Sequence, residues 1–290
     1  MKPPPFDLHL PASMEEAVSL LAELGDGAKV LAGGQSLVPM LSLRLAFFDH
    51  LVDIGGIPEL RGITYEDGTV VVGASTVDAV VEHDASVAQT VPLLARATPM
   101  IGHFQIRNRG TVGGSIAHAD PAAEYPAVAL ALDAEMEVAS VRGRRHIPAS
   151  EFFTGFWTTA VEPDELLVAV RFPTRRGRSG FAVREFARRF GDFAIAGAVV
   201  AVEVGSDDRI ERCAIGLLGL GPIPLRATAA EQAMVGLGAN GSLDEIGALA
   251  MADLAEVPSD LHGSERYRRR VGAAMVSRAL DDAIREAIDA

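Results

Sequence analysis

Two short segments, each containing adjacent glycines, place the strongest constraint on how this chain can fold. They are residues 32–36, Ala-Gly-Gly-Gln-Ser, and residues 111–115, Thr-Val-Gly-Gly-Ser; the second follows a basic stretch at residues 107–109. Paired glycines let successive main-chain N–H groups converge on an anion, because no Cβ stands in the way. Each segment alone is equally well explained as a tight turn. Together they are typical of a pyrophosphate site enclosed by two lobes, and so of a dinucleotide.

The length and composition indicate a globular protein of more than one domain. The chain has 290 residues, about twice a typical domain of roughly 100–150 residues. No apolar run reaches the roughly 18–20 residues of a membrane-spanning helix. Prolines at residues 3–5 would interrupt a secretory signal, so we expect a cytoplasmic location. The net charge of −13 argues against a nucleic-acid partner.

The single cysteine, Cys213, limits the metal chemistry of the chain. An iron–sulfur cluster and a structural zinc site each need about four ligands, mostly cysteine or histidine. Cys213 lies in the apolar run at residues 213–218, where a buried, unreactive thiol is favoured over a nucleophile. We therefore expect no metal bound through cysteine on this chain.

The first part of the chain alternates helical and strand patterns around the glycine segments. Ser13 and Glu16 form a capping box that predicts a first helix over residues 13–24. Asp67 and Gly68 predict a tight hairpin turn. The other predicted elements are strands at residues 29–31, 51–54, 60–65, 69–73, 135–141 and 166–172 and helices at residues 37–45, 76–83 and 88–101.

A second domain is predicted after a linker rich in arginine and glycine at residues 173–180. Strand patterns at residues 182–186, 195–204 and 210–218 predict an antiparallel meander, and the chain from residue 243 onward is largely helical in pattern. The predicted fold class is therefore α+β. The predicted domains are residues 1–176, with lobes at about residues 1–56 and 57–176, and residues 177–290.

One glycine motif is better explained as a connection than as a nucleotide site. Residues 236–241, Gly-Leu-Gly-Ala-Asn-Gly, match the pattern G-x-G-x-x-G, which binds dinucleotides only when it follows a strand and opens a helix. Here it follows a helical pattern at residues 229–235, and Ser242 with Glu245 resembles the capping box of the next helix. A helix-to-helix loop is favoured.

Polar residues after the second glycine segment suggest two further sites, and neither is favoured. His118, Asp120 and Glu124 are potential metal ligands, but nothing in their spacing fixes a coordination geometry, and contact with a ligand through hydrogen bonds is favoured. Ser115, His118 and Asp120 could be combined as a catalytic triad. Residues this close on one loop rarely reach the required geometry, and no G-x-S-x-G motif is present.

The two glycine segments and their flanks resemble a known family. Residues 31–39 and 105–121 are similar to the medium, FAD-binding subunits of aerobic carbon monoxide dehydrogenase, quinoline oxidoreductase and xanthine dehydrogenase, which are molybdenum hydroxylases. The likeness extends to blocks at residues 6–11, 165–173, 188–193 and 259–268. It implies a two-lobed FAD-binding domain of the p-cresol methylhydroxylase and vanillyl-alcohol oxidase type, followed by an α+β C-terminal flavoprotein domain with a three-stranded antiparallel sheet and helices.

The resemblance also implies which residues contact FAD. Main-chain amides of both glycine segments would hold the pyrophosphate, polar side chains after the second segment would contact the sugar, adenine or ribityl parts, and a C-terminal loop would face the isoalloxazine. The implied contact residues are Ala32, Gly33, Gly34, Gln35, Ser36, Leu37, Val38, Ile101, Thr111, Gly113, Gly114, Ser115, Ala117, His118, Asp120, Glu124, Leu167, Asp192 and Phe193. No catalytic residue and no metal ligand is expected.

Three positions depart from the family pattern or have no clear role. Glu124 stands where many relatives have Asp, and Phe193 where some have Tyr, so a hydroxyl contact is missing there. Arg184 falls near a position that is Lys in the xanthine dehydrogenase branch, and its role is left open.

The resemblance implies a division of labour among subunits. A molybdenum cofactor on a large subunit would oxidise the substrate, [2Fe–2S] clusters on a small subunit would relay electrons, and FAD on this chain would pass them to an acceptor, in a dimer of heterotrimers. Two other functions stay open. The chain could be a self-contained flavin-dependent oxidase, which would need a catalytic base or covalent flavin attachment, or a nucleotide-binding scaffold without activity.

Overall fold

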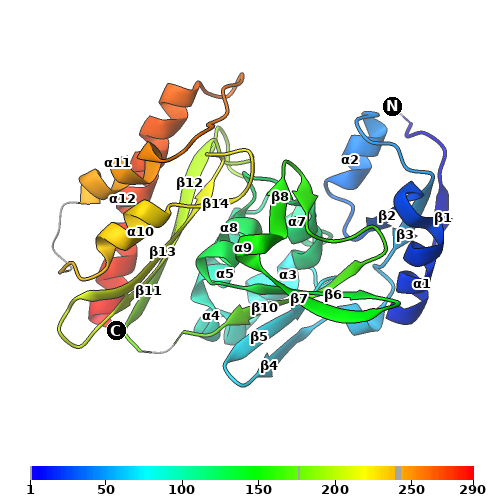
Figure 1. Ribbon diagram of the computed structural model, residues 1–290, viewed down its shortest axis with the longest axis horizontal. Helices are drawn as coiled ribbons and strands as arrows, with labels where there is room; N and C mark the ends of the chain where they lie inside the picture. The colour runs from blue at the N-terminus through cyan, green and yellow to red at the C-terminus, as the bar shows by residue number, and fades with distance from the viewer. Residues whose placement is uncertain (1, 176, 239–242) are drawn as a thin grey trace.

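The chain forms three units that lie side by side in the computed structural model, which describes residues 2–175, 177–238 and 243–290 (Figure 1). An N-terminal lobe and a C-terminal domain lie at opposite ends, and a middle lobe lies between them. No helix in these described ranges is both long and apolar enough to cross a membrane.

The N-terminal lobe is a small parallel sheet with two helices. The sheet has the order β1-β3-β2. The elements are β1 (Asp7–His9), α1 (Met14–Leu24), β2 (Ala28–Leu31), α2 (Leu37–Ser42) and β3 (His50–Asp53). The predicted capping box is confirmed, because the Glu16 amide donates to Ser13 Oγ at 3.2 Å. The helix predicted to reach residue 45 ends earlier, since Arg44 has a φ of 58°, which an α-helix cannot contain.

The middle lobe is a five-stranded antiparallel sheet covered by short helices. Its strands, in the order β4-β5-β10-β6-β7, are β4 (Ile63–Glu66), β5 (Thr69–Gly73), β10 (Leu166–Pro173), β6 (Glu135–Ser140) and β7 (Gly143–Pro148). Its helices are α3 (Asp78–His83), α4 (Ala85–Thr90), α5 (Pro92–Ala97), α6 (Phe104–Arg107), α7 (Val112–His118), α8 (Glu124–Ala131) and α9 (Ala149–Phe152), and a small hairpin joins β8 (Phe153–Gly155) to β9 (Thr158–Thr159).

One sequence prediction for the middle lobe needs correction, and one is confirmed. The helix predicted over residues 88–101 is three pieces, α4, α5 and a 3₁₀ turn at Thr98–Met100. Pro92 and Pro99 cannot donate to a continuous helical ladder, so one new piece begins at Pro92 and the next at Thr98, one residue before Pro99. The hairpin at Asp67 and Gly68 is confirmed, and both residues have positive φ.

The C-terminal domain is an antiparallel sheet with helices on one face. The sheet has the order β11-β12-β13-β14, so the three predicted strands are joined by a short fourth. The strands are β11 (Ser179–Phe186), β12 (Ala196–Val204), β13 (Ile210–Leu218) and β14 (Leu225–Arg226), and the helices are α10 (Thr228–Met234), α11 (Leu243–Ala252) and α12 (Glu265–Asp289). The predicted glycine-rich connection follows α10, while residues 239–242, with the proposed cap Ser242, lie outside the described residues.

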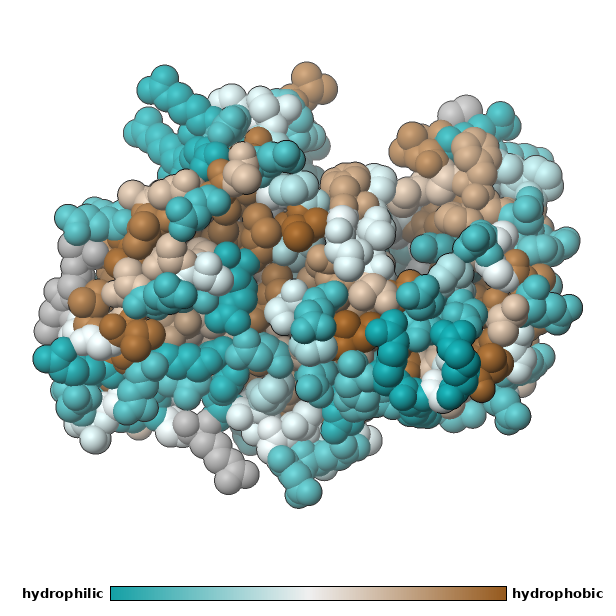
Figure 2. Space-filling view, viewed as in Figure 1, coloured by the Kyte–Doolittle hydropathy of each residue, from teal (hydrophilic) through white to brown (hydrophobic). Residues whose placement is uncertain are grey.

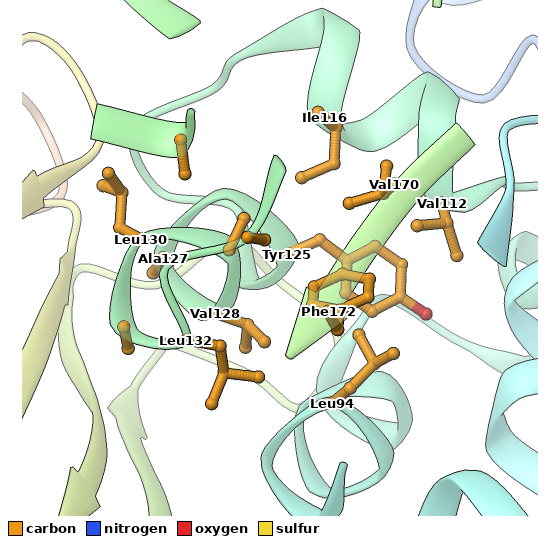
Figure 3. Packing of buried hydrophobic residues seen from close by; sticks show 14 of the residues in the cluster. Leu94, Val112, Ile116, Tyr125, Ala127, Val128, Leu130, Leu132, Val170 and Phe172 are labelled. Carbon is orange, nitrogen blue, oxygen red and sulfur yellow. The ribbon is translucent and has the colours of Figure 1, made fainter. Parts of the chain in front are cut away.

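The helix α8 joins the middle lobe to the C-terminal domain, because all eight of its residues are buried. On one side Tyr125 and Val128 pack against Leu94 and Phe172 of the middle lobe (Figure 3). On the other side α8 lies against β12 and β13. A Cβ on Gly216 would lie 2.4 Å from the carbonyl oxygen of Ala127, so only glycine permits this approach. One hydrophobic core therefore crosses the domain boundary.

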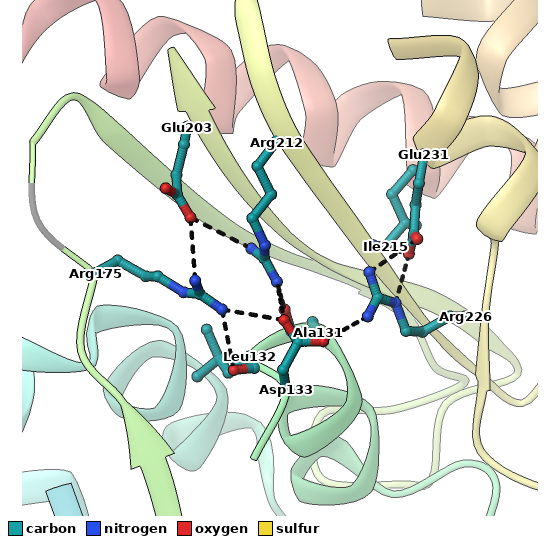
Figure 4. Close-up of polar contacts among 9 residues, drawn as sticks. All are labelled: Ala131, Leu132, Asp133, Arg175, Glu203, Arg212, Ile215, Arg226 and Glu231. Atoms are coloured by element: carbon teal, nitrogen blue, oxygen red, sulfur yellow. Dashed lines mark hydrogen bonds and ion pairs between the residues drawn. The ribbon is translucent and has the colours of Figure 1, made fainter. Parts of the chain in front are cut away.

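Charged groups fix the end of α8 to the C-terminal domain. Asp133, which follows α8, accepts hydrogen bonds from Arg175 at 3.1 Å, from Arg212 at 2.6 Å and from Arg226 at 2.6 Å (Figure 4). Glu231 holds Arg226 from the other side through two hydrogen bonds of 2.9 Å. Asp133 thus connects the linker, β13 and β14 to the middle lobe.

Replacing Asp133 with asparagine should weaken this connection. Asparagine tolerates the φ of 54° at this position, but three arginines would lose the carboxylate that they share and keep only Glu203 or Glu231. Because Asp133 is half exposed, we expect D133N to lower the free energy of unfolding by about 1–2 kcal/mol, measured by urea denaturation. D67N is a matched control, since Asp67 also has positive φ, lies in an exposed turn and has no ion pair with another described residue. Equal stability of D133N and D67N would contradict the prediction.

Candidate functional site

The two glycine segments contact each other in the structure. A Cβ on Gly33 would lie 2.0 Å from the carbonyl oxygen of Arg109 and 2.9 Å from Gly110 Cα, so no other residue fits at position 33. A Cβ on Gly114 would lie 3.5 Å from the Ala32 Cβ. The sequence prediction that these segments act together is therefore supported by their direct contact.

The first glycine segment, residues 32–36, presents main-chain amides that have no partner. It connects β2 to α2, and Gly34 has a φ of 73°. None of its five amides donates a hydrogen bond to another described residue. The Gln35 side chain donates to the carbonyl oxygen of Gly33 at 2.9 Å, which fixes the shape of the turn. Unpaired amides in a part-buried turn indicate a ligand that accepts hydrogen bonds.

The second segment, residues 111–115, differs because most of its amides bond within the protein. The Gly113 amide donates to the carbonyl oxygen of Ala74 at 3.0 Å, and the Gly114 amide donates to Thr111 Oγ1 at 3.0 Å. The amides of residues 112 and 115 also bond to main-chain oxygens. Among the five, only the Thr111 amide donates to no described residue. This segment is mainly a packing surface for the first.

The C-terminal domain contributes a loop to the same region. A Cβ on Gly191 would lie 2.8 Å from the His103 ring and 3.0 Å from the Gly102 carbonyl oxygen, so the loop packs closely on residues just after Ile101. Asp192 is exposed, and Phe193 is 60% exposed. The loop that bears Asp192 and Phe193 thus packs, through Gly191, on the segment that follows Ile101.

Four further predicted residues differ widely in exposure. Leu37 and Val38 lie on α2, where Val38 is 47% exposed, and Ala117 is exposed on α7. Apolar residues gather over α2, at the upper right of Figure 2. Leu167, in contrast, is 5% exposed and packs in the core of the middle lobe.

His118 and Asp120 form a polar group with a residue that the sequence did not indicate. The Trp157 indole donates to Asp120 Oδ2 at 3.1 Å and stacks on the His118 ring with centroids 5.5 Å apart. Burial lowers the pKa of His118, although the nearby Asp120 carboxylate opposes the shift. No hydrogen bond joins Ser115 to His118 in the described part of the chain, so the structure gives no support to a triad. Trp157 could not be found from sequence, because an isolated tryptophan is more often a core residue.

Arg184 points away from this region. Its guanidinium pairs with Asp282 on α12, on the outer face of the C-terminal sheet. Side chains alternate along a strand, and the next residue, Glu185, has a buried Oε2 with no hydrogen-bond partner among the described residues. The sequence analysis singled out Arg184, whereas it is the charge of the neighbouring Glu185 that contributes to the raised pKa of Glu124 in the middle lobe.

Three carboxyl groups, buried in Asp78 and Glu124 and half-buried in Glu185, have raised pKa values. Burial raises the pKa of Glu124 to about 8, with a further contribution from Glu185. Burial also raises the pKa of Asp78 to about 7 and that of Glu185 to about 7. Asp78 and Glu185 were not predicted as site residues, because their proximity to Glu124 arises only from the fold.

Each of the two regions of the chain matches a known protein family. Residues 4–175 match the FAD binding domain in molybdopterin dehydrogenase, and residues 181–283 match the CO dehydrogenase flavoprotein C-terminal domain. The chain belongs to the molybdopterin dehydrogenase FAD-binding family.

Relatives of this family match the chain over nearly its full length. The 6-hydroxypseudooxynicotine dehydrogenase complex subunit alpha of Paenarthrobacter nicotinovorans is 42% identical, over 99% of this chain and 97% of that subunit. A solved structure of carbon monoxide dehydrogenase from Hydrogenophaga pseudoflava has a TM-score of 0.95 at 40% identity, covering 99% of each chain. Quinoline 2-oxidoreductase from Pseudomonas putida 86 has a TM-score of 0.92 at 34% identity, covering 99% of this chain and 100% of that one. The predicted resemblance and fold class are confirmed.

A methyl group on Gly33 should separate the two glycine segments of this family member. Because the new Cβ would meet the Arg109 carbonyl oxygen at 2.0 Å, we expect G33A to lower the free energy of unfolding by about 2–3 kcal/mol, measured by urea denaturation. G56A is the matched control, since a Cβ there meets nothing within 4 Å. A G33A chain as stable as G56A would show that the contact between the segments is not tight.

The stability of the ligand-free chain should fall as pH rises from about 5 to about 8. Glu124 keeps its proton in the folded chain up to a pKa of about 8 but loses it near 4.5 when unfolded, so within this window the unfolded state binds fewer protons. Each unit of separation corresponds to at most about 1.4 kcal/mol. E124Q removes this titration and should show a flatter dependence of Tm on pH between 5 and 8.5. If the Tm of E124Q depends on pH in the same way as that of the wild type, the raised pKa of Glu124 would be contradicted.

Proposed function

We propose that this chain is the FAD-binding electron-transfer subunit of a heteromeric molybdenum hydroxylase. The observation that carries the proposal is the row of five unpaired amides at residues 32–36, held against a second glycine segment in a chain whose two regions match the flavoprotein family. Such amides suit a pyrophosphate, because each N–H can donate to a phosphate oxygen.

The residues of the first segment fit FAD better than those of the second. In this proposal the amides of residues 32–36 and of Thr111 donate to the pyrophosphate, and the Ser115 side chain offers a hydroxyl. Gly113 and Gly114 contribute by their small size, since their own amides bond to Ala74 and Thr111. The remaining proposed contacts are Leu37, Val38, Ile101, Ala117, His118, Asp120, Glu124, Leu167, Asp192 and Phe193.

When bound, FAD supplies the redox chemistry, and the chain supplies binding and orientation. Asp120 is held in place by Trp157 and by the Ala122 amide, which donates to Asp120 Oδ1 at 2.9 Å. Phe193 presents an apolar face on the C-terminal loop. No catalytic acid or base on this chain is part of the proposal, and no group of three or more His, Cys, Asp or Glu side chains in the described residues is arranged to hold a metal.

The partners are part of the same proposal. A large subunit would hold the molybdenum cofactor and a small subunit the [2Fe–2S] clusters, in a dimer of heterotrimers. The names of the relatives support this, since they are subunits or medium chains of dehydrogenases. The one cysteine of this chain agrees with clusters held elsewhere. A division into residues 1–176, with lobes at about 1–56 and 57–176, and 177–290 is supported by the two matched regions. A cytoplasmic location is also proposed, from the sequence.

The cofactor content of the natively purified chain tests the proposal. We expect about one FAD per chain, an absorbance spectrum that bleaches with dithionite, and neither iron nor molybdenum in the isolated chain. A chain that is colourless and does not bind added FAD would overturn the proposal. Turnover of a small alcohol or amine by the chain alone would instead identify a self-contained flavin oxidase.

A further inference from the structure

Three acidic side chains beside the glycine segments form no ion pair within the described residues, although the charge of Arg107 acts on Asp78. Asp78 is 2% exposed and Glu124 is 5% exposed, and Glu185 projects from β11 of the C-terminal domain. None of the three forms a salt bridge within the described residues. Asp78 Oδ1 and Glu185 Oε2 are buried without any hydrogen-bond partner there. A buried carboxylate without a partner is strongly unfavourable, whereas a neutral carboxylic acid costs much less.

Neighbouring acids are balanced, which sets these three apart. Glu82 accepts two hydrogen bonds from Arg107, at 2.7 and 3.0 Å, so that guanidinium is already committed. Asp120 accepts from the Trp157 indole and the Ala122 amide and has His118 at 3.9 Å. The absence of a salt bridge within the described residues therefore distinguishes these three carboxyl groups from Glu82 and Asp120.

The three groups connect the glycine segments to the C-terminal domain. The Asp78 amide donates to the carbonyl oxygen of Gly110 at 2.9 Å, and a Cβ on Gly110 would lie 2.4 Å from Asp78 Oδ2. Gly110 in turn touches Gly33 of the first segment. Glu124 begins α8, which packs on β12, and β12 pairs with β11 so that Gly197 lies opposite Glu185.

A negatively charged ligand would shift the equilibrium between the ionised and protonated forms of these carboxyl groups. A pyrophosphate on the unpaired amides would repel ionised carboxylates nearby, and repulsion in a poorly solvated region is weakly screened. Protonation of the carboxyl groups removes that repulsion. An anion that binds here therefore favours the protonated forms, and by linkage the protonated forms favour the anion.

We propose that Asp78, Glu124 and Glu185 form a proton-binding group that takes up protons when FAD binds, so that FAD affinity depends on pH. This inference rests on the proposed function and extends it. The raised pKa values of the three groups, about 7 for Asp78, about 8 for Glu124 and about 7 for Glu185, place the dependence above pH 7. The charged groups that face them are Arg107 and Glu82 beside Asp78 and Asp120 beside Glu124, and the Tyr125 hydroxyl stays neutral because burial raises its pKa well above 10.

The test is a titration of the flavin-free full-length chain with FAD, followed by flavin fluorescence, at pH 6.0, 7.5 and 8.5. Calorimetry at pH 8.5 in two buffers of different ionisation enthalpy gives the number of protons taken up. We expect the FAD dissociation constant to rise with pH above about 7, so that it is severalfold higher at pH 8.5 than at pH 6.0, since each proton taken up corresponds to at most about tenfold per pH unit. Uptake at pH 8.5 should approach one proton.

Two variants and one control test which residues cause the pH dependence of FAD binding. E124Q should reduce both the pH dependence and the proton uptake, and E185Q should reduce them by a smaller amount while leaving the glycine segments untouched. E151Q is the control, because Glu151 is exposed on α9 and forms no ion pair with a described residue; it should behave as the wild type. If E124Q does not fold, E185Q alone decides, since Glu185 is only partly buried.

The outcomes separate this inference from the proposed function. A dissociation constant that is independent of pH, or proton uptake that is the same in E124Q, E185Q and wild type, would overturn the proton-binding group while FAD binding stands. A chain that binds no FAD at any of the three pH values would overturn the proposed function itself.

Discussion

The burial of α8 on all sides is the constraint on which the rest of the structure depends. A helix of eight residues with no solvent-exposed face cannot be stable alone, and its stability must come from what packs against it. The middle-lobe core supplies one side and the C-terminal sheet the other, where Gly216 allows the closest approach. The ends of the helix are also specified, since Glu124 begins it and Asp133, bound by three arginines, follows it. The loop that bears Phe193 keeps its place near Ile101 because this interface is fixed.

The parts of the fold that could be predicted are those whose signals are local. The cap at Ser13 and the hairpin turn at Asp67 and Gly68 depend on residues a few positions apart, and both were correct. The strand β7 was missed because its residues are polar and exposed at a sheet edge, without the alternation that marks a strand. The run at residues 88–101 has helical periodicity, but its prolines divide it into separate pieces. Both errors, the missed strand and the divided helix, arose where backbone hydrogen bonds determine the secondary structure more than the apolar pattern does.

The location of the site could be predicted from the sequence, but the contacts that its residues make could not. Glycine pairs at residues 33–34 and 113–114 indicated an anion site, and the structure brings them into contact. Which amides are free could not be predicted, because the partner of Gly113 is Ala74, from the end of a strand almost 40 residues earlier. Trp157 is a similar case, since its contact with Asp120 joins two loops. Arg184 and Glu185 differ only in which face of β11 they occupy, and the register of β11 on β12 sets that face.

A core that crosses a domain boundary has a consequence for how these proteins can be recombined. Val199, Ala201 and Ala214 of the C-terminal sheet belong to the same hydrophobic cluster as Tyr125 and Phe172. The two regions that match separate family models thus share one hydrophobic core, and removing either would expose apolar surface of the other. A chimera that exchanges C-terminal domains between relatives would have to transfer the matching face of α8 as well, so the natural point of exchange lies upstream of this helix and not at the linker.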